Sequence, residues 1–123
     1  MNPNIEIVEA GEEYLTEAAK LFDAYRVFYE QNSDIEAVTQ FLKARILQKE
    51  SVLFLARYEN EYVGFTQLYP SFTSVGLAPI WILNDLYVAE THRQKGIAQQ
   101  LIETAANYAR KTNRKKLRLA KFS

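Results

Sequence analysis

The segment RQKGIA, from Arg93 to Ala98, places two basic side chains around a glycine at the start of a predicted helix. Backbone N–H groups at a helix N-terminus are unpaired and carry partial positive charge, so they attract anions. Gly96 has no Cβ to block a phosphate, and Ala98 keeps the first helical turn slim. Arg93 and Lys95 add charge from side chains that we expect to be mobile. The segment predicts a phosphate cradle, with an ordinary structural turn as the alternative.

Other catalytic chemistries lack the residues that they need. The chain has no cysteine, which excludes a cysteine nucleophile, a disulfide and a thiolate metal site. His92 is the only histidine, and one imidazole cannot supply the ligands of a zinc site, so we expect no metal. The sequence contains neither a G-x-x-x-x-G-K-[ST] loop nor a G-x-G-x-x-G turn in a first βα unit. Kinase and dehydrogenase chemistry are therefore not expected.

The composition is typical of one soluble domain. A chain of 123 residues has room for one core, and no apolar run approaches the roughly 20 residues that span a bilayer. Fifteen basic and fifteen acidic residues cancel, so we expect neither nucleic acid nor a membrane as a partner. The basic run at 110–118 is interpreted as a solvated helix end. The acidic N-terminal segment lacks a signal-like apolar stretch, which favours a cytoplasmic location.

The first half of the chain predicts one strand and two helices. Alternation at 5–10 predicts a strand, and apolar residues three or four apart predict an amphipathic helix over about 12–31. A second helix is expected to begin at Ser33, because Ser33 and Glu36 have the spacing of a capping box.

The second half predicts the elements that hold the RQKGIA segment. Residues 51–58 and 62–70 predict a hairpin, and 71–79 a loop with strand character at its edges. Residues 80–88 predict a central strand covered on both faces, 97–112 a helix and 116–120 a last strand. The order β-α-α-β-β-β-α-β predicts an α/β fold in which helices cover a sheet. The RQKGIA segment follows the most apolar strand, where open α/β sheets commonly bind ligands.

Residues 84–109, NDLYVAETHRQKGIAQQLIETAANYA, resemble motif A of the GNAT superfamily of N-acetyltransferases. The pattern R/Q-x-x-G-x-G/A is matched by Arg93, Gly96 and Ala98. The order of the elements upstream is also similar to that of this superfamily, so the resemblance covers essentially the whole chain. It implies a GNAT-like mixed sheet and a single acetyl-CoA-binding domain over 1–123.

The resemblance implies acetyl-CoA as the co-substrate and a primary amine as the acceptor. The pyrophosphate would be held by backbone N–H groups of the segment Gln94, Lys95, Gly96, Ile97 and Ala98, beside Arg93. The pantetheine arm would pair with the backbone of Leu86, Tyr87 and Val88. The amine would attack the thioester directly, and a strand amide near Leu86 or Tyr87 would polarise the thioester carbonyl.

Two departures from the family pattern concern the catalytic base. Isoleucine stands at position 82, which we align with the strand glutamate of the histone-acetylating branch, and isoleucine cannot take a proton. Polyamine-type members carry a Glu-Asp pair where this chain has Asn84 and Asp85. Asp85 is therefore the candidate base or amine-binding group. The alternative is an acidic residue satisfied by neighbouring backbone donors.

A further departure lies at the end of the sequence. Family members continue past the strand matched by LRLA into a helix whose tyrosine commonly protonates the leaving thiolate, and then into two more strands, whereas this sequence ends at AKFS. We therefore expect a C-terminally incomplete domain that lacks the last helix and strands. An uncovered strand edge is a template for another chain, which predicts a homodimer.

Three functions stay open at this point. The first is an acetyl-CoA-dependent N-acetyltransferase that acts on a small-molecule or peptide amine. The second is a truncated, catalytically weak or inactive acyl-CoA-binding module, and the third is a dimeric assembly subunit. Aromatic candidates for acceptor contacts lie in the first helices and the strands, although such residues usually belong to the core; they are Tyr25, Phe28, Tyr29, Tyr69 and Trp81.

Overall fold

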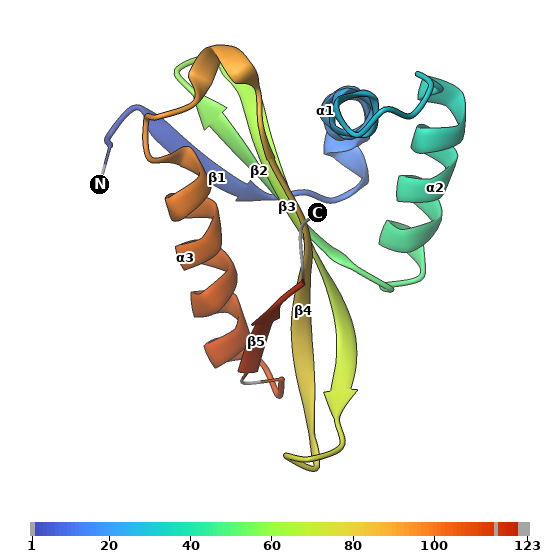
Figure 1. Ribbon diagram of the computed structural model, residues 1–123, viewed down its shortest axis with the longest axis vertical. Coiled ribbons are helices and arrows are strands. Elements are labelled where there is room, and N and C mark those ends of the chain that lie inside the picture. The colour runs from blue at the N-terminus through green and yellow to red at the C-terminus, as the bar shows by residue number, and fades with distance from the viewer. Residues whose placement is uncertain (1, 115, 121–123) are drawn as a thin grey trace.

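The computed structural model describes residues 2–114 and 116–120. Its elements follow the predicted order: β1 (Ile5–Glu9), α1 (Leu15–Phe28), α2 (Ile35–Leu47), β2 (Val52–Tyr58), β3 (Glu61–Thr73), β4 (Ala78–Val88), α3 (Ile97–Lys111) and β5 (Lys116–Leu119) (Figure 1). Short 3-10 turns at Glu12–Tyr14 and Glu90–His92 precede α1 and follow β4. The predicted α/β fold with a mixed sheet is confirmed.

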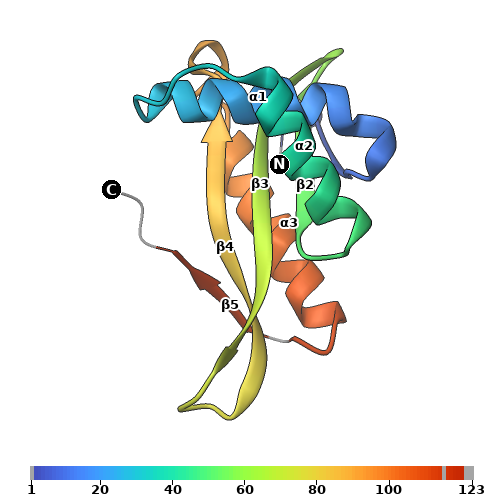
Figure 2. The ribbon, with the colours of Figure 1, turned by 90° about the vertical axis from the view of Figure 1, so that its right-hand side faces the viewer.

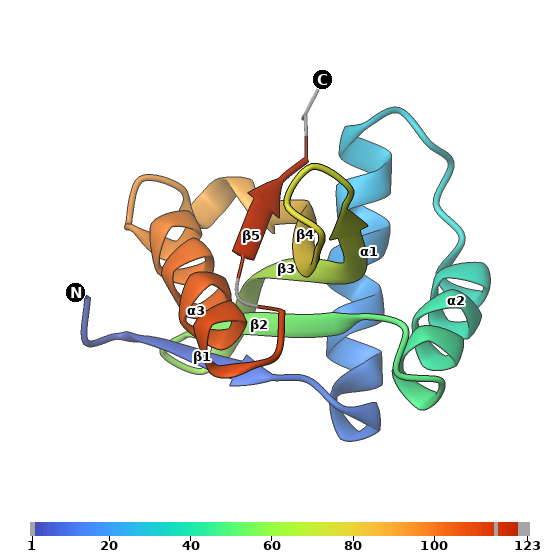
Figure 3. The same cartoon turned by 90° about the horizontal axis from the view of Figure 1, so that it is seen from below.

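The five strands form one sheet in the order β1-β2-β3-β4-β5. Neighbouring strands are antiparallel except for β4 and β5, which are parallel and are joined through α3. Helix α3 covers one face of the sheet and α1 and α2 cover the other, which gives three layers (Figure 3). Each face therefore has its own apolar core.

Helix α3 owes its position to a stripe of residues four apart. Ile97, Leu101, Ala105 and Ala109 are buried against the sheet, as the sequence pattern predicts. None of the helices in the described part of the chain is long and apolar enough to cross a bilayer.

The loop expected at 71–79 is confined to 74–77, because β3 runs to Thr73 and β4 begins at Ala78, so the strand character expected at its edges is confirmed. The resulting hairpin extends beyond the helices (Figure 2). Strand β4 lies inside the sheet between β3 and β5, as predicted for a central strand. Polar and turn-forming residues at 71–79 suggested a loop, whereas cross-strand pairing from Ser71–Ile80 to Thr73–Ala78 extends both strands.

The start of α2 differs from the predicted capping box. Its N-cap is Asp34, whose carboxylate accepts a hydrogen bond from the Ala37 amide at 3.1 Å. The Ser33 hydroxyl instead donates to Asp23 of α1 at 2.6 Å, and the Asp34 amide donates to the same carboxylate at 2.7 Å. The buried Asp23 therefore joins the end of α1 to the start of α2.

We expect Asp23→Ala to lower the free energy of unfolding by about 2 kcal/mol, because two hydrogen bonds to a carboxylate are lost. The Ser33 hydrogen bond first, and then the Asp34 amide, hold the pKa of Asp23 below its usual 3.8. A lowered pKa in the folded state stabilises the protein above the usual value, and this stability is lost as pH falls through the folded pKa.

Urea denaturation of the parent and Asp23→Ala should thus show the full difference near pH 7 and a shrinking one below about pH 4. Glu36→Ala is the control, and we expect it to change stability by less than about 1 kcal/mol. A larger effect of Glu36→Ala than of Asp23→Ala would contradict the assignment.

Candidate active site

The RQKGIA segment forms the N-terminus of α3. Gly96 is the N-cap and has a φ of 84°, in the left-handed region that favours glycine. As a glycine, this N-cap residue has no side chain that could cap the turn. A Cβ built on Gly96 would meet no heavy atom within 4 Å among the described residues, so the space in front of the helix is open. An uncapped helix N-terminus beside open space is suited to an anion.

A pocket of about 430 Å³ lies in front of this turn. It is lined by the end of β4, the start of α3 and the end of α1, namely Phe28, Tyr29, Leu86, Tyr87, Val88, His92, Arg93, Gln94, Gly96, Ile97, Ala98 and Gln99. The structure thus brings together every residue predicted to contact the coenzyme except Lys95. We call this hollow the β4–α3 pocket.

Arg93 is held in place, contrary to the predicted mobile side chain. Its Nε donates to the Val88 carbonyl oxygen at 2.9 Å. Its guanidinium lies over the rings of Phe28 and Tyr87, 5.0 and 5.9 Å from their centroids. A planar guanidinium stacks on aromatic faces in this way. Arg93 therefore connects the end of α1 to the wall of the pocket.

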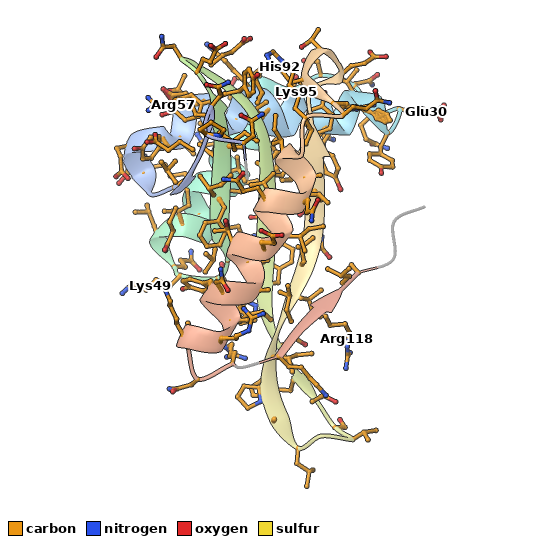
Figure 4. The ribbon with its side chains drawn as sticks, turned by 90° about the vertical axis from the view of Figure 1, so that its left-hand side faces the viewer. Glu30, Lys49, Arg57, His92, Lys95 and Arg118 are labelled. Carbon is orange, nitrogen blue, oxygen red and sulfur yellow. The ribbon has the colours of Figure 1, made fainter. Side chains whose placement is uncertain are left out.

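Lys95 points elsewhere. Its ammonium nitrogen lies 5.2 Å from the centre of the Tyr58 ring, and the residue does not line the pocket. Figure 4 shows Lys95 and His92 at the end of the molecule where α3 begins. The Lys95 side chain therefore does not face the pocket in this structure, although its backbone belongs to the same turn.

The edge of β4 that faces away from β3 is only partly paired. Strand β5 pairs with Ile80 to Leu83, and the Ala120 amide donates to the Leu83 carbonyl at 2.9 Å. Beyond that point, Leu86 to Val88 have no strand partner on this side among residues 2–114 and 116–120. An extended group could pair with that backbone, as the resemblance implies.

Gly64 of β3 supports the wall of the pocket, and the sequence interpretation missed it. A Cβ at Gly64 would lie 2.9 Å from the Tyr87 carbonyl oxygen and 3.5 Å from a methyl carbon of Ile97. Only glycine lets β3 approach β4 this closely beneath α3. The sequence does show a glycine inside a predicted strand, and such a glycine often marks a place where another backbone comes close.

A β-bulge decides where Asp85 points. Gln67 pairs with Asp85 and Leu68 pairs with Leu83, so Asn84 is an extra residue in β4. Leu83 packs on the α3 face, and a regular strand would place Asp85, two residues later, on that face too. The extra residue turns Asp85 to the face covered by α1 and α2.

Side chains hold both carboxylate oxygens of Asp85. The Tyr25 hydroxyl of α1 donates to Oδ1 at 2.9 Å, and the Gln67 amide donates to Oδ2 at 3.1 Å. Asp85 is 7% exposed, and none of the described residues forms an ion pair with it. The sequence suggested backbone N–H groups as the alternative partners of Asp85, whereas the donors in the structure are side chains. Asp85 does not line the β4–α3 pocket, but it shares a sheet face with Tyr87, which does.

Two features of this cluster bear on its chemistry. Burial, followed by the charge of Asp85, raises the pKa of Tyr25 far above its ordinary value, so Tyr25 stays a proton donor. Gln67 is fully buried, and its Oε1 has no hydrogen-bond donor among the described residues. The Asp85 carboxylate, which keeps further lone pairs and a small exposed fraction, is an acceptor suited to an ammonium group.

The aromatic candidates for acceptor contacts are divided by the sheet. Phe28 and Tyr29 are 52% and 42% exposed and line the pocket. Tyr25 and Tyr69 are half-buried, and both lie near Asp85. Trp81 lies on the α3 face, where its indole nitrogen donates to Thr112 at 2.9 Å, so its candidacy is wrong.

Comparison with known proteins places this geometry in a family. Residues 18–122 match the Acetyltransferase (GNAT) family. An N-acetyltransferase of Bacillus subtilis strain 168, YhfO, described as uncharacterized, is 46% identical over 101 residues, which cover 82% of this chain and 68% of that protein. A probable acetyltransferase of Haemophilus influenzae is 37% identical over 98 residues, with 79% and 67% covered.

A solved structure shows the same fold. The crystal structure of a probable acetyltransferase is 43% identical and superposes with a TM-score of 0.86, covering 95% of this chain and 79% of the other. The RQKGIA turn, the layered sheet and the match over most of the chain all indicate the same family. The chain belongs to the GNAT family of acetyltransferases, which are acetyl-CoA-dependent acyltransferases.

Proposed function

We propose that this chain transfers an acetyl group from acetyl-CoA to a primary amine by direct attack of the amine. The observation that carries the proposal is the open turn at Gly96, which faces a pocket whose other wall is Leu86 to Val88 of β4. On that side, this part of β4 pairs with no strand among the described residues. The first feature fits a diphosphate and the second fits an extended arm with amide groups.

The residues of the β4–α3 pocket fit acetyl-CoA. Backbone amides of Gln94 to Ala98 would hold the diphosphate, with the guanidinium of Arg93 beside it. The backbone of Leu86, Tyr87 and Val88 would orient the pantetheine arm, and an amide of Leu86 or Tyr87 would donate to the thioester oxygen. When bound, the coenzyme supplies an activated acyl group as a thioester.

Asp85 serves the acceptor in this proposal. An amine arrives as an ammonium ion and must lose one proton before its lone pair can attack. A carboxylate oxygen of Asp85 takes that proton and later releases it to solvent, while Tyr25 and Gln67 keep the carboxylate oriented. The net reaction converts an ammonium and a thioester into an amide, a thiol and one proton.

The test is thiol release from acetyl-CoA in the presence of a panel of primary amines, with the acetylated product identified by mass spectrometry. The proposal predicts release that depends on the amine. Coenzyme binding without any acetylated amine would favour the acyl-CoA-binding module, and absence of binding would favour an assembly subunit.

We also propose that two copies associate along β5. Strand β5 pairs on one side with β4 and has no second strand partner among the described residues, and Leu119 is 53% exposed on it. Sedimentation equilibrium should give twice the mass of one chain, and Leu119→Lys should weaken association. A monomer at concentrations of about 100 µM would contradict this part of the proposal.

A further inference from the structure

A second hollow lies on the same side of the sheet as Asp85. It has a volume of about 470 Å³ and is lined by Arg45, Lys49, Glu50, Tyr69 and Pro70, where the end of α2 passes over β3. We call it the α2 hollow. Figure 4 labels Lys49 at its border, at a distance along the molecule from Lys95 and the start of α3.

Strand β3 runs from this hollow to the hydrogen-bond partner of Asp85, Gln67. Tyr69 lines the hollow, and Gln67 donates to Asp85. Residues two apart on a strand point to the same face and lie about 7 Å apart. The α2 hollow and the carboxylate that Gln67 holds therefore lie on the same face of the sheet, one strand repeat apart.

The hollow has an excess of positive charge. Its lining residues include two cations, Arg45 and Lys49, and one carboxylate, that of Glu50. The Arg45 Nε contacts Glu50 at 2.9 Å, and no described residue accepts a hydrogen bond from the terminal guanidinium nitrogens of Arg45. These donors are suited to a carboxylate or a phosphate.

Tyr69 lies between the two charges. Burial first, then the carboxylate of Asp85, raise the pKa of Tyr69 to about 12, whereas Arg45 lowers it. Its hydroxyl is thus close enough to the Asp85 carboxylate and to the Arg45 guanidinium for both charges to affect its pKa. At neutral pH it is a neutral hydroxyl that can donate to, or accept from, a ligand passing between them.

We infer that the acceptor is a small amine that also carries an acidic group. Its ammonium donates to the carboxylate of Asp85, which Gln67 holds in place, and its acidic group pairs with Arg45 and Lys49 across Tyr69. The inference rests on the proposed function for the acetylation of this molecule. Its binding site is argued only from the Asp85 carboxylate and the charged residues of the α2 hollow.

The experiment compares each acidic amine with a counterpart that lacks the acid. The pairs are γ-aminobutyric acid with its amide, lysine with its decarboxylated diamine, and phosphoethanolamine with ethanolamine. Binding is measured by titration calorimetry without coenzyme, and kcat/KM with acetyl-CoA. We expect at least one acidic amine to bind about tenfold more tightly than its counterpart, with kcat little changed.

Arg45→Gln should remove this preference by weakening the acidic amine about tenfold while leaving its counterpart unchanged, and Arg45→Lys should retain part of it. Arg110→Gln, on α3 and away from the hollow, is the matched control and should change neither ligand. Equal affinity for both members of every pair overturns the inference, as does an Arg45→Gln effect that is the same for both members. If an acidic amine binds selectively but no amine is acetylated, the inference stands and the proposed function fails.

Discussion

Gly96→Glu should abolish coenzyme binding, with an affinity for acetyl-CoA at least about 100-fold below that of the parent. The Cβ position at Gly96 faces open space rather than protein, so a side chain there enters the region that the diphosphate would occupy. A carboxylate adds repulsion to bulk, because both groups are anionic. Thermal denaturation reports the loss directly: coenzyme at 100 times its dissociation constant should stabilise the parent by about 2.7 kcal/mol. The same concentration should not stabilise the variant.

Gly96→Ala separates binding from backbone strain. An alanine at a φ of 84° is strained by about 1 kcal/mol, but its methyl group carries no charge and meets no atom of residues 2–114 or 116–120 within 4 Å. We expect it to lose stability without coenzyme and to keep binding within about tenfold of the parent. Parent-like coenzyme binding by Gly96→Glu would show that the cradle is elsewhere.

The second large effect is expected for Asp85→Asn, which should lower kcat by about 100-fold near pH 7. The amide of this variant cannot take a proton from the ammonium group. The variant should fold, because its oxygen can still accept from Tyr25 and the Gln67 amide can rotate to present Oε1 to the new donor. Coenzyme affinity should be unchanged, since Asp85 does not line the β4–α3 pocket.

The dependence of kcat on pH distinguishes loss of a catalytic base from a structural effect of Asp85→Asn. Without a base, only the free amine reacts, and its fraction rises about tenfold per pH unit below the pKa of the amine. The deficit of Asp85→Asn relative to the parent should therefore shrink as pH rises. A deficit that is constant with pH would indicate a structural role for Asp85, and a parent-like kcat would remove it from the mechanism.

The sequence was sufficient to predict the turn between β4 and α3, because the signals there are local. The stripe through Ile97 and Leu101 fixed α3, and Gly96 ahead of that stripe marked a turn that needs a left-handed residue. The apolar run that became β4 fixed the strand that enters the turn. Each signal depends on residues within a few positions of one another.

The surroundings of Asp85 depend on contacts between distant segments, so the sequence could not predict them. Alternation along β4 would place Asp85 beside Leu83, and only pairing with β3 reveals the extra residue that reverses its direction. In the same way, Arg93 is fixed by Phe28 of α1, and Ser33 leaves its expected capping role because Asp23 accepts its hydroxyl. Neither neighbour is visible in the local pattern.

The central claim is that backbone amides at the start of α3 hold the diphosphate of the coenzyme. The most direct measurement is a titration of the ¹⁵N-labelled chain with coenzyme A, followed by the backbone amide resonances. We predict that the largest shifts fall on Gln94 to Ala98, with smaller shifts on Leu86 to Val88. Saturable shifts confined to other segments, with the amides of 94–98 unmoved, would contradict the claim.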